Sequence, residues 1–286
     1  MTETLVIDGL EVLSFDDGVL KTSVAVSSME QQEAIAITGA ADDGSLLIPV
    51  NNFLFRRGNS TVLIDAGAAD SMQPTLGKLP EKLRGGGIDP AAITHILLTH
   101  LHPDHANGLI DQNDQAVFPN AELVLHEVEH AFWTSAVRDE DPEPVKRNKI
   151  RSQRNLAPYR DRTQLVWDDT EILGCKPILA PGHTPGHTCW LITTDDRPIM
   201  AWGDLVHFSD IQVAHPDVSV TFDVDPGKAR DTRLRMLERI ANDNLIIAGA
   251  HVLRPGFARV TRSNHGFRLE SLHAGSASMT NTQDTL

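Results

Sequence analysis

The chain lacks several features that would indicate particular classes of protein. Its 286 residues contain two cysteines, Cys175 and Cys189, which do not have the spacing of a metal-binding pair. Two cysteines in a chain of this length do not make a disulfide framework, so we interpret both as buried thiols. No apolar run approaches the length of a membrane-spanning helix, and we expect no membrane association.

Positive charge is also scarce. The 25 Lys and Arg residues stand against 39 Asp and Glu, which gives a formal net charge of −14. Phosphate binding relies on clusters of basic side chains, so this balance argues against a general nucleic-acid-binding role, although it leaves room for local basic patches. The N-terminal segment has neither a basic start nor a long apolar stretch. A secretory signal is therefore not expected, and a cytoplasmic location is the default.

The remaining composition suits one large domain. An apolar fraction of 41% is enough for a sizeable core. We expect a single domain over residues 1–270, with an insertion of loop and helix at about 126–163. The pattern fades after Phe267, and residues 271–286 are expected to form a mobile tail.

Local patterns predict a layered α/β fold. Strand-like runs broken by turns fill residues 4–65, a helical pattern covers 69–84, and an apolar run at 93–98 predicts a buried strand. Strand, helix and strand in this order indicate a parallel crossover. Active sites in such sheets lie at the carboxyl ends of the strands.

The densest group of candidate metal ligands follows the strand at 93–98. In extended backbone, the two histidines that end the strand point to the same side. Pro103 suits the first turn of a helix, which would begin with the other two ligands. Two adjacent pairs suggest two divalent ions, and four such side chains within six positions are hard to explain by packing. The four residues are His100, His102, Asp104 and His105.

Further candidates end later strands. A loop rich in Gly and Pro carries two histidines, of which the first is preferred as a ligand, while His187 could hydrogen-bond nearby. Gly182 and Gly186 suit tight backbone near a metal. The single candidates at the three strand ends are His183, Asp204 and His251.

Asp65 ends the strand that precedes the main cluster by one crossover. It is equally well interpreted as a turn former or as a partner for the free N–H of a metal-bound histidine. A second histidine pattern, at 126–130, matches the H-E-x-x-H of helical zinc proteases. Because a strand runs into His126 and a stronger cluster already exists, we interpret this pattern as a solvated helix start.

The motifs together resemble the signature of the metallo-β-lactamase superfamily over residues from about 45 to 267. They are Thr99-His-Leu-His-Pro-Asp-His105, Pro181-Gly-His-Thr-Pro-Gly-His187, Gly203-Asp204 and Ala250-His251, preceded by Asp65. Shorter stretches resemble the methyl parathion hydrolase branch, which includes enzymes acting on organophosphate triesters, aryl esters and lactones. These stretches are 74–79, 118–121, Phe132-Trp133 and 215–220.

The resemblance implies an αββα sandwich with two metal ions in the cleft between its sheets. It assigns one ion to His100, His102 and His183, and the other to Asp104, His105 and His251. Asp204 would bridge both ions, and Asp65 would support the ligands from behind. Zinc is the first expectation, although manganese, cobalt or iron would accept the same nitrogen and oxygen ligands.

Two departures from the family pattern bear on the substrate. The export signal common in methyl parathion hydrolases is missing. Acyl-homoserine lactonases of the superfamily place a tyrosine three positions after the bridging Asp, where this chain has His207. His207 is a candidate for substrate contact and equally for a role behind the ligands or at the surface.

Our hypothesis is a hydrolase for a small ester, lactone or organophosphate triester, attacked by hydroxide formed from water on the two cations. Asp104 is also a candidate proton relay, although a carboxylate bound to a metal is a poor base. The partner would be a small-molecule substrate, and a homodimer is possible. Candidates for an apolar pocket wall, each of a type more often found in a core, are Phe53, Phe132, Trp133 and Phe208.

Two alternatives remain. Some relatives of this fold bind iron and act as oxidoreductases, and others could be non-catalytic ligand-binding members with a decayed site. Every ligand position is filled here, which favours hydrolysis by two metals. Nuclease relatives carry an inserted domain, which the length and acidity of this chain disfavour.

Overall fold

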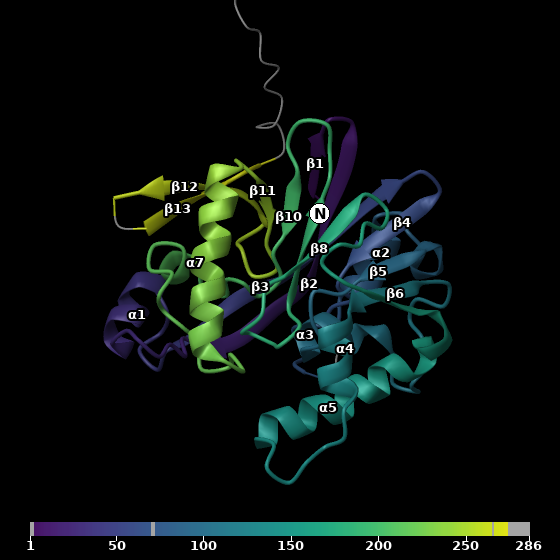
Figure 1. Cartoon of the computed structure of the whole chain (residues 1–286), viewed down its shortest axis with the longest axis horizontal. Helices are drawn as coiled ribbons and strands as arrows, with labels where there is room; N and C mark the ends of the chain where they lie inside the picture. Colours follow the sequence, from purple (N-terminus) through teal and green to yellow (C-terminus); the bar gives the residue numbers. More distant parts are fainter. Residues whose placement is uncertain (1–2, 70–71, 265, 274–286) are drawn as a thin grey trace, which may run out of the picture.

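The computed structural model describes residues 3–69, 72–264 and 266–273, and within them two β-sheets face each other (Figure 1). The first sheet has its strands in sequence order: β1 (Glu3–Ile7), β2 (Leu10–Ser23), β3 (Ser45–Arg57), β4 (Ser60–Ile64), β5 (His95–Leu97), β6 (Glu122–His126) and β7 (Thr163–Val166). The second runs in the order β13 to β8: β13 (Gly266–Ser271), β12 (Phe257–Ser263), β11 (Ile246–Ala248), β10 (Ile199–Ala201), β9 (Thr188–Ile192) and β8 (Cys175–Leu179).

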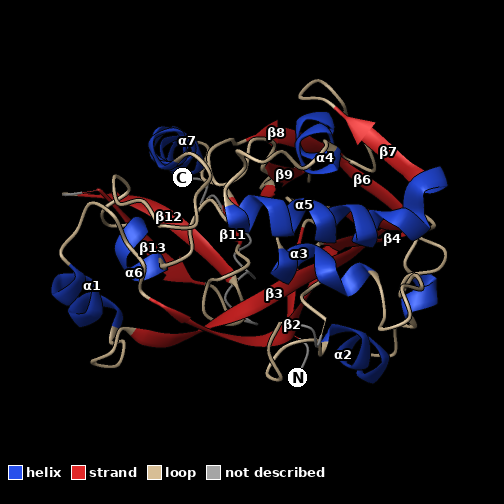
Figure 2. Ribbon diagram, turned by 90° about the horizontal axis from the view of Figure 1, so that it is seen from below, coloured by secondary structure: helices blue, strands red, loops and turns tan. Residues whose placement is uncertain are grey.

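Helices cover the outer faces of both sheets, as the view in Figure 2 shows. The first sheet is covered by α2 (Leu79–Gly85), α3 (Pro103–Ala106), α4 (Glu127–Thr134) and α5 (Glu143–Leu156), together with the short turns η1 (Pro90–Ala92), η2 (Asn107–Leu109) and η3 (Ala157–Arg162). The second sheet is covered by α7 (Pro226–Asn242), while α1 (Gln31–Thr38) packs beside α6 (Ser209–Gln212). This is the αββα sandwich that the sequence predicts. No helix of the described residues is long and apolar enough to span a membrane.

Strand direction places the functional residues at one edge. In the first sheet β4, β5, β6 and β7 are mutually parallel, and in the second β10 and β11 are parallel. Parallel neighbours bring their carboxyl ends to the same edge, so the segments that follow β4, β5, β10 and β11 can meet there.

The helix expected over residues 69–84 is shorter than predicted, because α2 begins at Leu79 and residues 72–78 form turns and irregular backbone. Asp17 explains the difference. Its buried carboxylate accepts hydrogen bonds from the N–H groups of Gly77 at 3.0 Å and Leu79 at 2.9 Å. Gly77 has a φ of 78°, which a helix cannot contain.

Regular structure also extends further toward the C-terminus than the sequence predicts. After Phe267, strand β13 continues to Ser271, and the backbone N–H of Leu272 donates to the carbonyl of Phe257. Leu272 is buried between the sheets, so the tail expected from residue 271 does not begin there. Residues 274–286 lie outside the described part, and the single-domain boundaries stay a prediction. Cys175 and Cys189 are both buried free thiols, as interpreted from the sequence.

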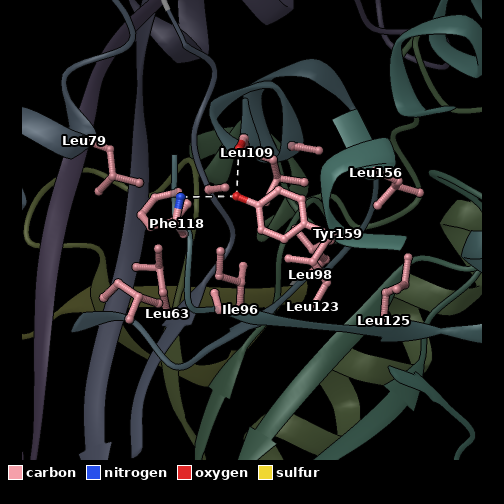
Figure 3. Close-up of a cluster of buried hydrophobic side chains, with 14 of the residues drawn as sticks. Leu63, Leu79, Ile96, Leu98, Leu109, Phe118, Leu123, Leu125, Leu156 and Tyr159 are labelled. Atoms are coloured by element: carbon pink, nitrogen blue, oxygen red, sulfur yellow. Dashed lines mark hydrogen bonds between the residues drawn. The ribbon is translucent and has the colours of Figure 1, made fainter. Parts of the chain in front are cut away.

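The hydroxyl group of Tyr159 is hydrogen-bonded within the core between the first sheet and its helices (Figure 3). Tyr159 is buried, and its Oη donates to the carbonyl of Leu109 at 2.7 Å and accepts from the N–H of Phe118 at 3.2 Å. These contacts tie η3 to the two ends of the loop that follows the predicted ligand cluster.

Replacing this tyrosine tests the contribution of the buried hydroxyl. Tyr159→Phe keeps the ring but leaves a buried carbonyl and a buried N–H without their partner, so the free energy of unfolding should fall by about 1–3 kcal/mol. Urea denaturation followed by tryptophan fluorescence measures the change. The control is Ser135→Ala, which removes an exposed hydroxyl from a helix end and should change stability by less than about 0.5 kcal/mol. Equal effects of the two substitutions would contradict this assignment.

Candidate metal centre

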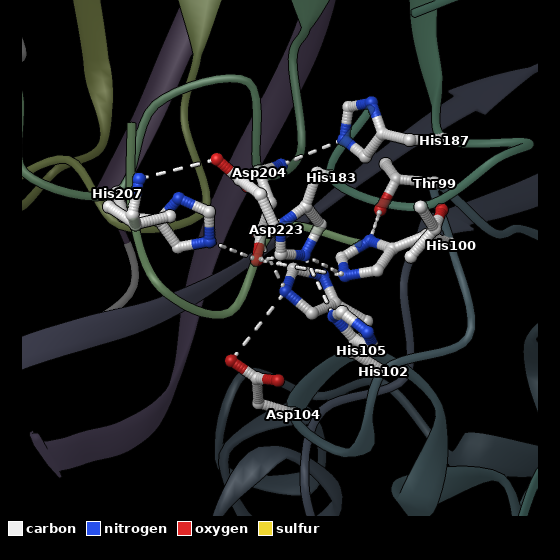
Figure 4. A network of polar contacts seen from close by, with 12 residues as sticks. Thr99, His100, His102, Asp104, His105, His183, His187, Asp204, His207 and Asp223 are labelled. Atoms are coloured by element: carbon white, nitrogen blue, oxygen red, sulfur yellow. Dashed lines mark hydrogen bonds and ion pairs between the residues drawn. The ribbon is translucent and has the colours of Figure 1, made fainter. Parts of the chain in front are cut away.

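Four segments meet at the edge formed by the parallel strands (Figure 4). His100 and His102 lie just beyond β5, and α3 then begins at Pro103, as the sequence predicts. The first turn of α3 carries the second pair of predicted ligands, and the other segments follow β8, β10 and β11. Seven predicted ligands are thereby brought together in two groups that share one carboxylate: His100, His102, Asp104, His105, His183, Asp204 and His251.

The first group is centred on His183. Its Nε2 lies 2.7 Å from Nδ1 of His102 and 3.2 Å from Nε2 of His100. Oδ2 of Asp204 lies 3.2 Å from the same Nε2 and 3.6 Å from Nε2 of His100. One donor atom of each of these four residues is within 4.8 Å of the others, which is the arrangement that a single cation needs.

The second group surrounds the other oxygen of the shared carboxylate. Oδ1 of Asp204 lies 3.0 Å from Nε2 of His105 and 3.2 Å from Nε2 of His251. Oδ2 of Asp104 lies 3.7 Å and 3.5 Å from the same two nitrogens. The two oxygens of Asp204 thus face different groups.

Asp65 orients two of the imidazoles from behind. Its carboxylate accepts the N–H of Thr99 at 2.7 Å, the hydroxyl of Thr99 at 2.8 Å and Nδ1–H of His105 at 2.8 Å. Because the Thr99 hydroxyl donates to Asp65, its oxygen accepts Nδ1–H of His100 at 3.0 Å. Asp65 is also a turn residue with a φ of 59°, an unusual conformation for a residue other than glycine. It therefore fills both roles that the sequence left open.

Two further imidazoles, those of His183 and His251, are oriented in the same way. Nδ1–H of His183 donates to Oδ1 of Asp223 at 3.0 Å, and Nδ1–H of His251 donates to the carbonyl of Pro49 at 2.8 Å. An imidazole that donates through Nδ1 presents the lone pair of Nε2 on its opposite side.

The centre therefore fits divalent cations. Four Nε2 lone pairs and the oxygens of two carboxylates converge in a buried space, and they repel one another unless positive charge lies between them. Nε2 of His105 and Oδ1 of Asp204 are buried and form no hydrogen bond within the described residues. Imidazole and carboxylate donors are the ligands that zinc, manganese, cobalt and iron accept.

The sequence matches the family model of the metallo-β-lactamase superfamily over residues 47–251. The chain belongs to this superfamily. Among solved structures, the hydrolase AbOPH of the β-lactamase superfamily has a TM-score of 0.90 and 28% identity, covering 96% of this chain and 98% of that one. AidC, a dizinc quorum-quenching lactonase in complex with the product N-hexanoyl-L-homoserine, has a TM-score of 0.88 and 25% identity over the same shares of the two chains.

Curated relatives match over shorter stretches. The uncharacterized protein YobT of Bacillus subtilis (strain 168) is 31% identical over 150 residues, which are 51% of this chain and 58% of that protein. The N-acyl homoserine lactonase AiiB of Agrobacterium fabrum is 32% identical over 102 residues, 29% of this chain and 35% of that one. The chain thus matches less than two thirds of the length of either relative.

The loop between β8 and β9 shows why this superfamily member carries two glycines beside its histidines. A Cβ on Gly182 would lie 2.1 Å from the backbone nitrogen of Ala229 in α7, and one on Gly186 would lie 2.0 Å from that of Glu129 in α4. The glycines allow the loop to fit between two helices, rather than to approach a metal as the sequence suggested. His187 accepts the N–H of Asp204 at 2.9 Å and donates to the carbonyl of Ala180, so it fixes the backbone of the shared ligand.

The remaining predicted residues separate into two sets. His207 and the helix residues Phe132 and Trp133 line a cavity beside the ligands. Phe53 is instead buried between the sheets against Phe257, with 5.2 Å between ring centroids. Phe208 packs in an apolar cluster with Ile211, Val218 and Val220. Neither of these two phenylalanines is among the described residues that line the cavity.

Sequence reasoning missed two buried carboxylates that hydrogen-bond to the segments carrying the candidate ligands. Asp223 lies outside every motif, and no local signal marks it as the partner of His183. Glu129 lies within the 126–130 pattern, where α4 indeed begins and where His126 and His130 join no metal-binding group of the described residues. The interpretation of a solvated helix start is wrong for Glu129, which is buried with hydrogen bonds from four donors.

Protons compete with cations at this centre. Burial alone would lower the pKa of His183, but its hydrogen bonds to Asp204 and Asp223 and the charges of these carboxylates raise it to about 9. Burial likewise opposes the effect of Asp204, Asp104 and Asp65 on His105, whose pKa nevertheless lies well above its usual value. Without cations, His183 and His105 are therefore protonated at neutral pH.

This competition predicts pH-dependent loading. A cation in the first group must displace the proton of His183 below about pH 9, and one in the second group must displace that of His105. The apparent affinity should therefore rise about tenfold per pH unit for each proton displaced. Co²⁺ titrations of metal-free protein at several pH values between 6.5 and 8.5, in competition with a chelator of known proton affinity, measure this slope. Proton release on loading, read with an indicator dye in weak buffer, provides an independent check. Affinity that does not change with pH would contradict the assignment of these protons.

Proposed function

We propose that the chain is a dinuclear metal-dependent hydrolase that acts on a small, neutral ester or lactone. The observation that carries the proposal is the sharing of Asp204, whose two oxygens face two separate groups of donor atoms. The ligand assignment is the one expected from the sequence. One ion would be held by His100, His102 and His183, the other by Asp104, His105 and His251.

A cavity of about 600 Å³ lies over both groups and supports a small organic substrate. His102 and Asp104 form part of its floor. Its walls come from strands β2 and β3, from loops that follow strands of the second sheet and from the insertion, and about half of the lining residues are apolar. The apolar lining residues are Leu20, Ile48, Pro103, Phe132, Trp133, Pro142, Pro144, Val145, Phe222 and Val224.

The charge of the cavity favours a neutral substrate. Asp104, Asp141, Asp204 and Asp223 contribute to its lining, whereas no Lys or Arg does so among the described residues. Bound cations would offset the charges of Asp104 and Asp204, but the rest of the described lining supplies Asp141 and Asp223 and no Lys or Arg. It therefore offers no positive side chain for the further negative charge of a substrate such as a phosphate monoester. Neutral esters, lactones and phosphotriesters all lack a negative charge, and therefore each of these classes suits this cavity.

Hydrolysis adds water across the acyl carbon–oxygen bond and releases a carboxylic acid and an alcohol, which remain joined in one molecule when the substrate is a lactone. Two cations bound at the centre would lower the pKa of a shared water and polarise the substrate's carbonyl oxygen. Asp204 would hold the two sites at a fixed separation. In the proposed reaction Asp104, which lines the cavity, would relay a proton to the leaving oxygen, although a carboxylate bound to a metal is a poor base.

In this proposal His207 would contact the substrate. It lines the cavity, its Nε2–H donates to Oδ2 of Asp204 at 2.8 Å, and its ring stacks on His251 with 5.6 Å between centroids. Its backbone N–H donates to Oε1 of Gln212, which fixes the loop after β10. A substrate bound over both groups of ligands would meet this ring.

The similarity to lactonases supports lactones as one class of neutral substrate. AidC is a dizinc lactonase whose structure contains N-hexanoyl-L-homoserine, a molecule with a short apolar acyl chain. The apolar walls described above would suit such a chain. Organophosphate triesters, suggested by the resemblance of 74–79 and 118–121 to methyl parathion hydrolases, are the second neutral class.

Metal removal tests the reaction. Protein loaded with Zn²⁺, Co²⁺ or Mn²⁺ should hydrolyse p-nitrophenyl esters, γ- or δ-lactones or a p-nitrophenyl dialkyl phosphate, and full chelation should abolish turnover. Readdition of the ion should restore it at two ions per chain. Activity that survives full depletion would contradict the proposal, as would one iron per chain together with oxygen consumption.

The apolar wall predicts a preference for longer acyl groups. Phe132→Ala removes a large apolar surface from the cavity, so kcat/KM for hexanoyl or octanoyl esters should fall about 10–100-fold, mainly through KM, because burying a large side chain is worth about 1.5–3 kcal/mol. Acetyl esters should be affected much less. Ile150→Ala removes an exposed apolar side chain of α5 that does not line the cavity, and it should change neither value. Equal losses for short and long esters would argue against this wall as the acyl site.

A further inference from the structure

We propose that Glu129 is a positioning residue that holds the three-histidine ion site and leaves the second site unaffected. The inference rests on the two-ion centre of the proposed function, but it is tested through ion binding rather than turnover. Glu129 lies in the first turn of α4 and belongs to neither group of candidate ligands. Its carboxylate instead connects the backbone segments that carry the three histidines of the first group.

One oxygen of the carboxylate holds the segment after β5. Oε1 of Glu129 accepts the N–H of Leu101 at 2.8 Å. This N–H belongs to the residue between His100 and His102, so the hydrogen bond fixes the backbone from which both imidazoles project.

The same oxygen also holds a side chain that packs on a ligand. Oε1 accepts Nε1–H of Trp133 at 2.7 Å. The indole of Trp133 meets the His102 ring edge to face, with 5.6 Å between centroids. Glu129 thereby limits the positions that the His102 ring can occupy.

The second oxygen holds the loop after β8. Oε2 accepts the hydroxyl of Thr184 at 2.7 Å and the N–H of Gly186 at 3.0 Å. Thr184 directly follows His183, and the close approach of Gly186 to the backbone of α4 brings this loop within reach. The single carboxylate thus joins two loops that are more than 80 residues apart in sequence and that together supply three ligands.

The second ion site is supported by different residues. His105 is oriented by Asp65, and His251 by the carbonyl of Pro49. Asp104 and His105 lie on α3, which begins after the segment that Glu129 holds. Removing the hydrogen bonds of Glu129 should therefore weaken one site selectively, which a general loss of stability would not do.

The substitution Glu129→Gln tests the carboxylate with little change of shape. A glutamine amide has one accepting oxygen and one donating nitrogen. Whichever way it is turned, its NH₂ group faces the N–H of Leu101 and the indole N–H, or the N–H of Gly186 and the hydroxyl of Thr184. At least one buried backbone N–H then loses its acceptor, and the loop that contains it can move.

The two sites are separated by removing one ligand at a time. His251→Ala leaves the three-histidine site, and His183→Ala leaves the other. In the His251→Ala protein, Glu129→Gln should lower the affinity for added Co²⁺ about 10–100-fold, the usual effect of losing a residue that orients metal ligands. In the His183→Ala protein, the same substitution should leave the Co²⁺ affinity unchanged. The d–d absorption of Co²⁺ reports the occupancy and the coordination geometry of each site.

Two control variants distinguish an effect on the position of the ligands from an effect of lost charge or of impaired folding. Glu127→Gln removes the same charge from the same helical turn at a partly exposed residue, and it should not change Co²⁺ affinity in either background. If Glu129→Gln does not fold, Thr184→Val removes one of the four hydrogen bonds and should weaken only the three-histidine site, by a smaller factor.

Other patterns of Co²⁺ binding would overturn the inference. Equal losses in both backgrounds would assign the effect to charge or to general destabilisation, and no loss in either would show that the ligand loops need no such support. A protein in which neither single-site variant binds Co²⁺ would remove the two-site basis itself. Wild-type protein that binds two Co²⁺ ions but hydrolyses no substrate would contradict the proposed function and leave the role of Glu129 intact.

Discussion

Mutual repulsion among buried lone pairs is the constraint on which this structure depends. Four imidazoles each donate a hydrogen bond from Nδ1–H to a partner outside the centre, so that Nε2 faces inward. They belong to His100, His105, His183 and His251. Asp204 faces the same space with both oxygens. Such an arrangement is stable only when cations or protons occupy the space, so the pattern of outer hydrogen bonds defines what the centre can bind.

The outer partners are chemically varied, although they perform one task. Two carboxylates, a hydroxyl and a backbone carbonyl each accept one Nδ1–H, and His187 fixes the backbone of Asp204 instead of a side chain. Glu129 and Asp65 play comparable parts in different places, since each joins a backbone N–H beside a ligand to other groups of the centre. The fold supplies these partners from both sheets and from helices on the first.

The sequence predicted the candidate metal ligands better than the residues that orient them, and the reason is physical. Ligands that end strands are marked by local signals: an apolar run, a Pro at a helix start, or glycines in a loop. The pairing of Asp223 with His183 spans 40 residues and depends on how the loop after β10 folds back, for which no local pattern exists. Glu129 was misjudged because a single glutamate near a helix start is usually solvated. Three of its four donors come from two segments far away in the sequence, and the fourth is Trp133 of the same helix. The helix expected over 69–84 was shortened by Asp17, a long-range acceptor of the same kind.

The division of the ligands between the two sheets has a consequence for folding. Residues after β5 belong to the first half of the chain, whereas Asp204 and His251 follow strands of the second sheet. A cation bound by both halves would act as a reversible cross-link that only the assembled sandwich can form. Conformational stability then becomes a function of free-ion concentration, increasing by about 2.7 kcal/mol when that concentration is a hundred times the dissociation constant. The resistance of this protein to unfolding would thus report the metal supply of its surroundings.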